Sequence, residues 1–223
     1  MKSSDNAEPK IIYCDNHLLI AEKPTGWLTQ PDDTGAVSLE QYCKNWVKRE
    51  FHKPGDVFLH AIHRLDRPVF GLVLFARTSK ALSRLNEMSR AQQIRRLYTA
   101  KIEGFLSAKE GTLEHYLVHG DHRANVVQAH HPEAKQAILS YKVEREEQNH
   151  TVILIELQTG RYHQIRAQFG AIGHSIVGDR RYGAKEGSND RIALGCTELI
   201  FLHPVTKQPL HFRSCIFVDS APS

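Results

Sequence analysis

The hydrophobic pattern near the start of the chain predicts a strand hairpin followed by a helix. Residues 10–22 contain two apolar runs separated by a polar turn at residues 15–17, as in two antiparallel strands. Over residues 39–47 the apolar side chains recur at three- and four-residue intervals, which is the spacing of one helical face. Ser38 followed by Gln41 matches a capping box, so we expect this helix to begin directly after Ser38.

The rest of the chain predicts a strand-rich fold with two further helices. One helix should begin near Thr78, and another should run from about His163 to Ile172, where Gly173 ends it. Several neighbouring strands are joined by turns too short for a parallel crossover. We therefore predict an α+β fold with a mixed, largely antiparallel central sheet flanked by helices. The expected strands are residues 57–61, 71–76, 96–104, 112–118, 136–145 and 151–157, with further strands around a turn at 204–207.

Length and composition fit one folded domain. The chain has 223 residues, of which 41% are hydrophobic and 24% charged. We expect residues 1–9 to form a disordered tail and residues 10–223 a single domain with two lobes and a cleft between them. No apolar run approaches the ~18 residues of a membrane-spanning helix, and the N-terminus lacks the apolar core of a secretory signal. The four cysteines form no C-x-x-C pair, so we expect free thiols in a reducing compartment. We expect a cytoplasmic monomer.

Positive charge is concentrated in two stretches of the chain. The formal net charge of +4 is compatible with a polyanionic partner, but many other enzymes are equally basic. Arginine presents planar, forked donors that match phosphate. From charge alone, a phosphate-binding surface and a merely solvated surface are equally good interpretations. The two stretches contain Arg84, Arg90, Arg95, Arg96 and Lys101, and Arg161, Arg166, Arg180 and Arg181.

The segment HRLDRPVFG, residues 63–71, has the most distinctive chemistry. Asp66 stands between two arginines in a loop that Pro68 and Gly71 delimit. Because positive neighbours favour the ionised carboxylate, we expect the pKa of Asp66 to lie below its reference value of about 3.9. An ionised carboxylate held in a site can act as a nucleophile or a base. From these residues alone, a structural Asp–Arg pair in a turn is the commoner arrangement.

A second segment, GRYHQIR at residues 160–166, runs from the end of a strand into a helix. The N-terminus of a helix presents unpaired N–H groups and partial positive charge, both of which attract phosphate. Arg161 and Arg166 are five residues apart, so they need not share a helical face. One could bind phosphate while the other points into a site, although simple helix capping with surface charge is an equally good interpretation.

Five segments, in order along the chain, resemble motifs of the RluA-type pseudouridine synthase family. The match includes HRLDRPVFG, which is similar to the family's H-R-L-D-R-x-T/S-S-G loop. It includes IIYCDNHLLIAEKPTGW, which looks like a strand pair ending in K-P-x-G, and RRLYTAKIEG, which looks like K-x-Y-x-A-x-V-x-G. It also includes LQTGRYHQIRAQFGAIGHSIVGDRRYG, similar to L-x-T-G-R-x-H-Q-I-R…G-H-P-I-x-G-D-x-x-Y-G, and HPVTKQPLHF, similar to H-P-x-T-G-x-x-L-x-F. The resemblance spans about residues 10–216.

The resemblance implies the pseudouridine synthase catalytic fold and an enzyme without cofactor or metal. Such an enzyme would isomerise specific uridines in ribosomal or transfer RNA through a flipped-out base. Asp66 matches the catalytic nucleophile, and Arg166 matches the arginine paired with it. Tyr98 matches a tyrosine that packs against the base and is a candidate for proton removal. Arg64 matches an arginine that enters the space left by the uridine. The remaining candidates for contact with the base or the RNA are Leu65, Ile165, Arg161, His163, Gln164, Arg180 and Arg181.

The chain also departs from the family's pattern. Val69-Phe70 replaces the usual T/S-S pair, Ser175 replaces the proline of G-H-P-I, and Leu194-Gly195-Cys196 replaces L-H-A. We also expect no N-terminal S4 RNA-binding domain. These departures bear on loop geometry and substrate choice more than on the catalytic set.

Two other functions are compatible with parts of the sequence. His60 and His63 are three apart, and five further histidines lie within residues 115–131, so a metal-dependent hydrolase is conceivable. The first pair lacks the H-E-x-x-H context, and hydrogen-bonded or solvated histidines are the more common case. A non-catalytic RNA-binding module would keep the basic surface, but the intact Asp66, Tyr98 and Arg166 set argues against it.

Overall fold

The structure is a computed structural model that describes residues 7–185, 187 and 190–214. The predictions for residues 1–6 and for Cys215 lie outside these residues. Within the described part, eleven strands form one sheet. The strands are β1 (Lys10–Cys14), β2 (Leu18–Lys23), β3 (His60–Ala61), β4 (Phe70–Ala76), β5 (Arg95–Glu103), β6 (Glu110–His119), β7 (Ala124–Val127), β8 (Lys135–Glu147), β9 (His150–Leu157), β10 (Leu194–Leu202) and β11 (Pro209–Arg213).

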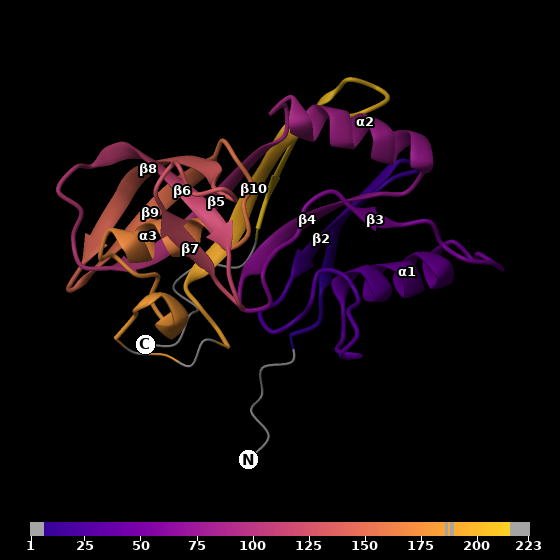
Figure 1. Cartoon of the computed structure of the whole chain (residues 1–223). Coiled ribbons are helices and arrows are strands. Elements are labelled where there is room, and N and C mark those ends of the chain that lie inside the picture. Colours follow the sequence, from indigo (N-terminus) through magenta and orange to yellow (C-terminus); the bar gives the residue numbers. More distant parts are fainter. Residues whose placement is uncertain (1–6, 186, 188–189, 215–223) are drawn as a thin grey trace, which may run out of the picture.

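The sheet is mixed and largely antiparallel, as predicted. Its order is β1-β2-β4-β10-β5-β9-β8-β6-β7, with β3 paired to β4 and β11 paired to β10. Among the described strands, the pair of β4 and β10 is parallel and the other pairs are antiparallel. Figure 1 shows strands β2 to β4 in one half of the molecule and β5 to β9 in the other, with β10 between them.

Helices cover both halves of the sheet. The described helices are α1 (Leu39–Glu50), α2 (Ser79–Arg90) and α3 (Gln164–Ala171), followed by the single 3₁₀ turn η1 (Arg180–Tyr182). In Figure 1, α1 and α2 lie on opposite sides of the β2–β4 group, and α3 lies in the other half. The Ser38 hydroxyl accepts the Gln41 N–H at 3.3 Å, which confirms the predicted helix start. The Gln41 side chain donates instead to Asn45 at 3.0 Å, so only half of the capping box forms.

Two elements were not predicted, and one predicted strand is shorter than expected. Strand β7 has only four residues and pairs with β6 at the edge of the sheet. A segment this short carries too little hydrophobic periodicity to be recognised, and the partner strand supplies its hydrogen bonds. The 3₁₀ turn η1 likewise has no periodic signal. The strand predicted at residues 57–61 is reduced to β3, because only His60 and Ala61 pair with β4.

The two halves meet where β4 and β10 run side by side. Gly195 pairs with Phe70, and Cys196 pairs with Gly71. Gly71 has a φ of +116°, and a Cβ there would overlap the backbone of Cys196. The backbone approach at this position therefore requires glycine. Since the other edge of β10 pairs with β5, this contact joins the loop before β4 to the second half of the sheet.

Two of the departures from the family's pattern pack against each other. A Cβ on residue 195 would overlap the aromatic ring of Phe70, which is 5% exposed. The large ring at position 70 and the missing side chain at position 195 are therefore complementary. A substitution of either residue alone would leave a cavity or overfill the core.

We predict that Phe70 and Gly195 are energetically coupled. Gly195→His alone should lower the free energy of unfolding by about 1–3 kcal/mol because the core is overfilled. Phe70→Ser alone should lower it by about 3–5 kcal/mol because a cavity remains. In the double variant the new imidazole occupies space left by the ring, so the combined loss should be smaller than the sum by at least about 1 kcal/mol. Urea unfolding measures all four proteins, and strict additivity would contradict the coupling.

Candidate active site

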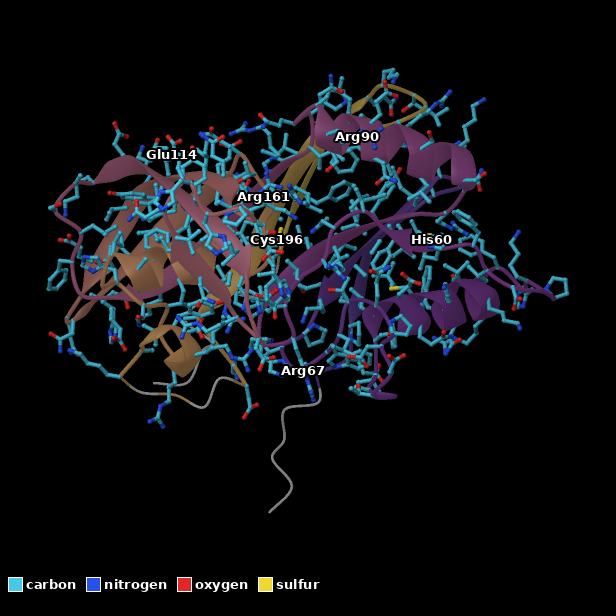
Figure 2. All side chains as sticks on the ribbon, viewed as in Figure 1. His60, Arg67, Arg90, Glu114, Arg161 and Cys196 are labelled. Carbon is cyan, nitrogen blue, oxygen red and sulfur yellow. The ribbon has the colours of Figure 1, made fainter. Side chains whose placement is uncertain are left out.

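A pocket of about 830 Å³ lies where the two halves of the sheet meet. Its walls come from the loop before β4, from β5, and from the loop that leads into α3. In Figure 2, Arg161 and Cys196 lie near the middle of the molecule, and Arg90 lies on α2. Arg180 and Arg181 are exposed on η1, outside the pocket. The other sequence-predicted residues all line it, namely Arg64, Leu65, Asp66, Tyr98, Arg161, His163, Gln164, Ile165 and Arg166.

The loop that carries Asp66 is held by the segment after β2. The Thr29 hydroxyl accepts the Leu65 N–H at 3.0 Å and donates to the Leu65 carbonyl at 3.0 Å. The Gly26 N–H donates to the Arg67 carbonyl at 2.8 Å, and the Arg67 Nε donates to the Gly26 carbonyl at 3.0 Å. These paired bonds on both sides of Asp66 restrict where its carboxylate can lie.

Lys23 adds an internal cross-link between the same two segments. Its side chain is fully buried, and its ammonium donates to the carbonyls of Pro24 at 3.1 Å, Trp27 at 2.8 Å and Arg67 at 3.2 Å. Burial lowers the pKa of Lys23 to about 7, while the negative charge of Asp66 opposes this shift. The lysine that begins the K-P-T-G stretch thus connects this turn to the Asp66 loop.

We expect Lys23→Met to destabilise the protein. Methionine has a similar length but no donor, so the carbonyls of Pro24 and Trp27 lose the bond to Lys23, while the Arg67 carbonyl keeps only its bond from the Gly26 N–H. The free energy of unfolding should fall by about 2–4 kcal/mol. Urea unfolding measures the loss. Lys80→Met, at an exposed position of α2, is the matched control and should change stability by less than about 0.5 kcal/mol. Similar losses in the two variants would show that the cross-link adds no stability.

Arg166 connects Asp66 to a second, fully buried carboxylate. Its Nη1 donates to Asp66 Oδ2 at 3.0 Å. Its Nε and Nη2 donate to the two oxygens of Asp179 at 2.6 and 2.9 Å. Burial acts to lower the pKa of Arg166, but the bonds to Asp179 and the charge of Asp66 raise it above its ordinary value. Arg166 is therefore a fixed cation, oriented by Asp179 and aimed at Asp66.

The structure corrects the expected pKa shift of Asp66. Burial raises the pKa of this carboxyl group, and the positive charges of Arg166, Lys23 and Arg64 offset only part of the rise. The expectation of a lowered pKa was wrong because it considered the flanking arginines and not the pocket walls, which remove water from the carboxylate. The Asp66 side chain is nevertheless 25% exposed, so a ligand in the pocket can reach it.

His163 meets the same guanidinium nitrogen of Arg166 that binds Asp66, and its Nε2 lies 3.3 Å from Asp66 Oδ2. Its Nε2 lies 2.9 Å from Arg166 Nη1, and its Nδ1 lies 2.8 Å from the Tyr182 hydroxyl. A guanidinium can only donate, so Nε2 accepts and the ring proton is on Nδ1. Burial and the charge of Arg166 lower the pKa of His163 to about 3, which keeps the ring neutral. The Tyr182 hydroxyl also accepts the Ala124 N–H at 2.7 Å, so the network extends to β7.

Tyr98 is placed in the pocket with its phenol protonated. The residue is 6% exposed, and burial raises the pKa of the phenol, as does the neighbouring Cys196. Leu65 and Ile165, which are 6% and 5% exposed, add apolar walls. The pocket thus combines an aromatic ring and apolar side chains with one carboxylate, which suits a flat heterocycle next to a reacting centre.

Gln164 is engaged within the protein. Its Oε1 accepts from the Thr159 hydroxyl at 2.8 Å and from the Arg161 N–H at 2.9 Å. Its Nε2 donates to the Ile138 carbonyl at 3.1 Å. These bonds hold the loop that carries Arg161, whose Nε donates to the Gln136 carbonyl at 2.9 Å. Arg64 is exposed at the pocket.

Sequence reasoning did not single out Asp179, Tyr182, Lys23 or Thr29. Asp179 and Tyr182 lie in the GDRRYG stretch, and their place in this family motif was the available signal, because a sequence does not show which polar side chains become buried.

Within the described residues, no three His, Cys, Asp or Glu side chains converge as a group that could hold a metal ion. His63 is buried, and its Nε2 accepts the Leu74 N–H at 3.3 Å. None of the helices in the described part of the chain is long and apolar enough to cross a membrane.

Comparison with known structures shows the fold. The human protein RNA Pseudouridylate Synthase Domain Containing 4 superposes with a TM-score of 0.77 at 18% identity, covering 93% of this chain and 88% of the human chain. The human protein RNA Pseudouridylate Synthase Domain Containing 1 gives a TM-score of 0.74 at 19% identity, covering 97% and 86%. The predicted catalytic fold is therefore confirmed.

Comparison of sequences shows the family. The family described as RNA pseudouridylate synthase matches residues 17–171. The chain is 30% identical to the dual-specificity RNA pseudouridine synthase RluA of Vibrio cholerae, over 93% of this chain and 81% of the relative. It is 33% identical to the ribosomal large subunit pseudouridine synthase D of Yersinia pestis, over 94% and 67%. It is also 30% identical to the uncharacterized RNA pseudouridine synthase YhcT of Bacillus subtilis, over 90% of this chain and 66% of that relative. The chain therefore belongs to the RNA pseudouridylate synthase family, whose members are enzymes that isomerise uridine to pseudouridine in RNA.

Proposed function

We propose that this protein isomerises specific uridines in ribosomal or transfer RNA, with Asp66 as its nucleophile. The observation that carries the proposal is the ion pair of 3.0 Å between Asp66 and Arg166 inside the pocket. The carboxylate is reachable by a ligand and is held by a guanidinium that Asp179 orients. This arrangement keeps a negatively charged oxygen at one place in a partly dry site.

The reaction needs a carboxylate and a closed site. The target uridine first leaves the RNA stack, which costs a few kcal/mol. Asp66 then forms a bond to C1′ as the N1–C1′ bond breaks, and the electron pair stays on the uracil. The uracil turns, and C5 attacks C1′, which releases the carboxylate. The released carboxylate of Asp66 takes the proton of C5 and passes it to solvent, and solvent supplies the proton that N1 gains. The pocket walls retain the detached uracil between these steps.

The other residues near Asp66 have separate roles in this proposal. Stacking of a base on an aromatic ring is worth roughly 1–3 kcal/mol, and Tyr98 would supply this contact. Because a protonated phenol does not readily accept a proton, we assign Tyr98 to packing against the uracil and not to proton removal. His163 and Asp179 position Arg166. Leu65 and Ile165 pack around the uracil.

The RNA outside the pocket would meet the arginines of the surface. Arg64 is exposed next to Asp66, and we propose that it enters the space left by the flipped uridine. Arg161 would contact phosphate at the pocket, while Arg180 and Arg181 would contact phosphate farther out. The pocket would then be the cleft between two lobes of a single catalytic domain. We propose that the protein acts as a monomer in the cytoplasm.

Tritium release tests this function directly. Formation of pseudouridine at a labelled uridine releases the hydrogen of C5, so purified protein should release tritium from C5-labelled RNA of a strain that lacks its gene. Ribosomal and transfer RNA are tested separately, and the modified position is then mapped. The proposal would be refuted if the protein bound RNA but released tritium from neither RNA, and if the pseudouridine map of the strain were unchanged. The protein would then be a non-catalytic RNA-binding module.

A further inference from the structure

One half-buried arginine in the pocket has no partner among the residues that the structure describes, whereas Arg64 and Arg90, which also make no hydrogen bond or ion pair with these residues, are exposed to solvent. Arg96 lies on β5, lines the pocket and is half-buried. Within the described residues its guanidinium makes no hydrogen bond or ion pair. A partly buried charge without a counterion is unfavourable, because water is lost and nothing replaces it. The position of this charge therefore needs a functional reason.

Two other arginines of the pocket, Arg95 and Arg166, are paired with carboxylates. Arg95 donates from Nε and Nη2 to both oxygens of Glu156, at 2.6 and 2.9 Å. Arg166 is paired with Asp179 and Asp66. The acidic side chains that line the pocket, Asp66 and Glu156, are thus already engaged, and the pocket offers no carboxylate to Arg96.

The surroundings of Arg96 place its charge beside the candidate base site. Residues two apart on a strand share a face of the sheet, so Arg96 and Tyr98 lie on the same side of β5. A Cβ on Gly160 would lie 3.6 Å from Arg96 Nη2 and 3.9 Å from Nη1. The guanidinium therefore rests against the start of the loop that leads to Arg166. Its charge also helps to lower the pKa of His63, which burial brings to about 3.

We propose that Arg96 is a substrate-binding residue that holds a backbone phosphate of the everted uridine. The proposal rests on the proposed function, since a uracil packed on Tyr98 brings its own ribose and phosphate along the same wall. A phosphate supplies the anion that the described part of the protein does not, and the two forked donors of a guanidinium match two phosphate oxygens. The small Gly160 leaves the face of the guanidinium free of a side chain.

Salt dependence of RNA binding tests the phosphate contact. The probe is a short oligouridylate, and its dissociation constant is measured by fluorescence anisotropy at several salt concentrations. Each phosphate contact to a single strand contributes about 0.7 to the slope of log affinity against log salt. Arg96→Gln should reduce this slope by about 0.7. Arg95→Gln is the matched control, and because Glu156 already neutralises Arg95, it should leave the slope unchanged.

Catalysis gives the second measurement. With C5-labelled RNA, Arg96→Gln should lower kcat/KM by about ten- to a hundredfold, the size of a lost bond to a charged group. Arg96→Lys should keep the slope but restore kcat/KM only in part, because an ammonium lacks the fork. Equal thermal midpoints of wild type and variants show that the fold is intact.

The outcomes separate this inference from the proposed function. If the wild type releases tritium and Arg96→Gln matches it in both slope and kcat/KM, the phosphate contact is refuted while the enzyme assignment stands. If the slope falls as expected and no protein releases tritium, the contact stands while the assignment of activity fails.

Discussion

Asp66→Asn should abolish pseudouridine formation and leave RNA affinity nearly unchanged. Asparagine has almost the same shape, and its oxygen can still accept from Arg166, so the pocket should keep its form. An amide does not form the bond to C1′ that the reaction needs. Turnover should fall by about 10⁴-fold or more, as when a nucleophile is removed from other enzymes. Tritium release measures turnover, and anisotropy with the same RNA measures affinity.

The control for this variant is the same substitution at a carboxylate outside the pocket. Asp56 is exposed between α1 and β3, and Asp56→Asn should release tritium as fast as the wild type. If Asp66→Asn released tritium at the rate of Asp56→Asn, Asp66 would not be the nucleophile. A variant that lost RNA affinity and activity together would show that Asp66 acts in binding.

Asp179→Asn should strongly destabilise the protein. Asp179 is fully buried and binds Arg166 through two bonds. The substitution leaves a buried guanidinium without its main counterion. It also replaces one accepting oxygen with an amide N–H₂, which cannot accept a hydrogen bond from Arg166. Removal of one partner of a buried ion pair costs about 3–5 kcal/mol. Activity should also fall, because Arg166 would no longer hold Asp66. Urea unfolding and single-turnover tritium release measure the two effects.

Glu156→Gln offers a matched comparison in the same fold. Glu156 binds Arg95 with the same two-bond geometry, but the side chains are 34% and 52% exposed. Solvent screens such a pair, so its loss should cost no more than about 1 kcal/mol. Equal destabilisation by Asp179→Asn and Glu156→Gln would show that water or another side chain can replace Asp179 as the partner of Arg166. In that case the positioning role of Asp179 would have to be abandoned.

The elements that could be predicted carry a local signal. The β1–β2 hairpin, α1 and α2 were found because apolar spacing, turn residues and the capping residue Ser38 act within a few positions. The resemblance to a family paired Asp66 with Arg166, which is a hundred residues away and has no local relation to it. Only their positions in separate motifs indicated that they belong together.

Other features depend on contacts that no local pattern contains. Strand β7 exists through its partner β6, and the ring of Phe70 fits position 195 because β4 and β10 run in parallel register there. Gln164 stands in a motif next to basic residues, which favoured a contact with RNA. Its amide instead forms hydrogen bonds with Thr159, Arg161 and Ile138.

The sequence by itself determined the type and order of most elements and the main residues that line the pocket, because side-chain periodicity and motif spacing are properties of the chain. The tertiary structure decided the direction of the Asp66 pKa shift, the neutral state of His163 and the lack of a partner for Arg96 among the described residues. These depend on burial and on distances between segments far apart in the chain. Desolvation and Coulomb interaction act through space, so they follow only from the folded arrangement.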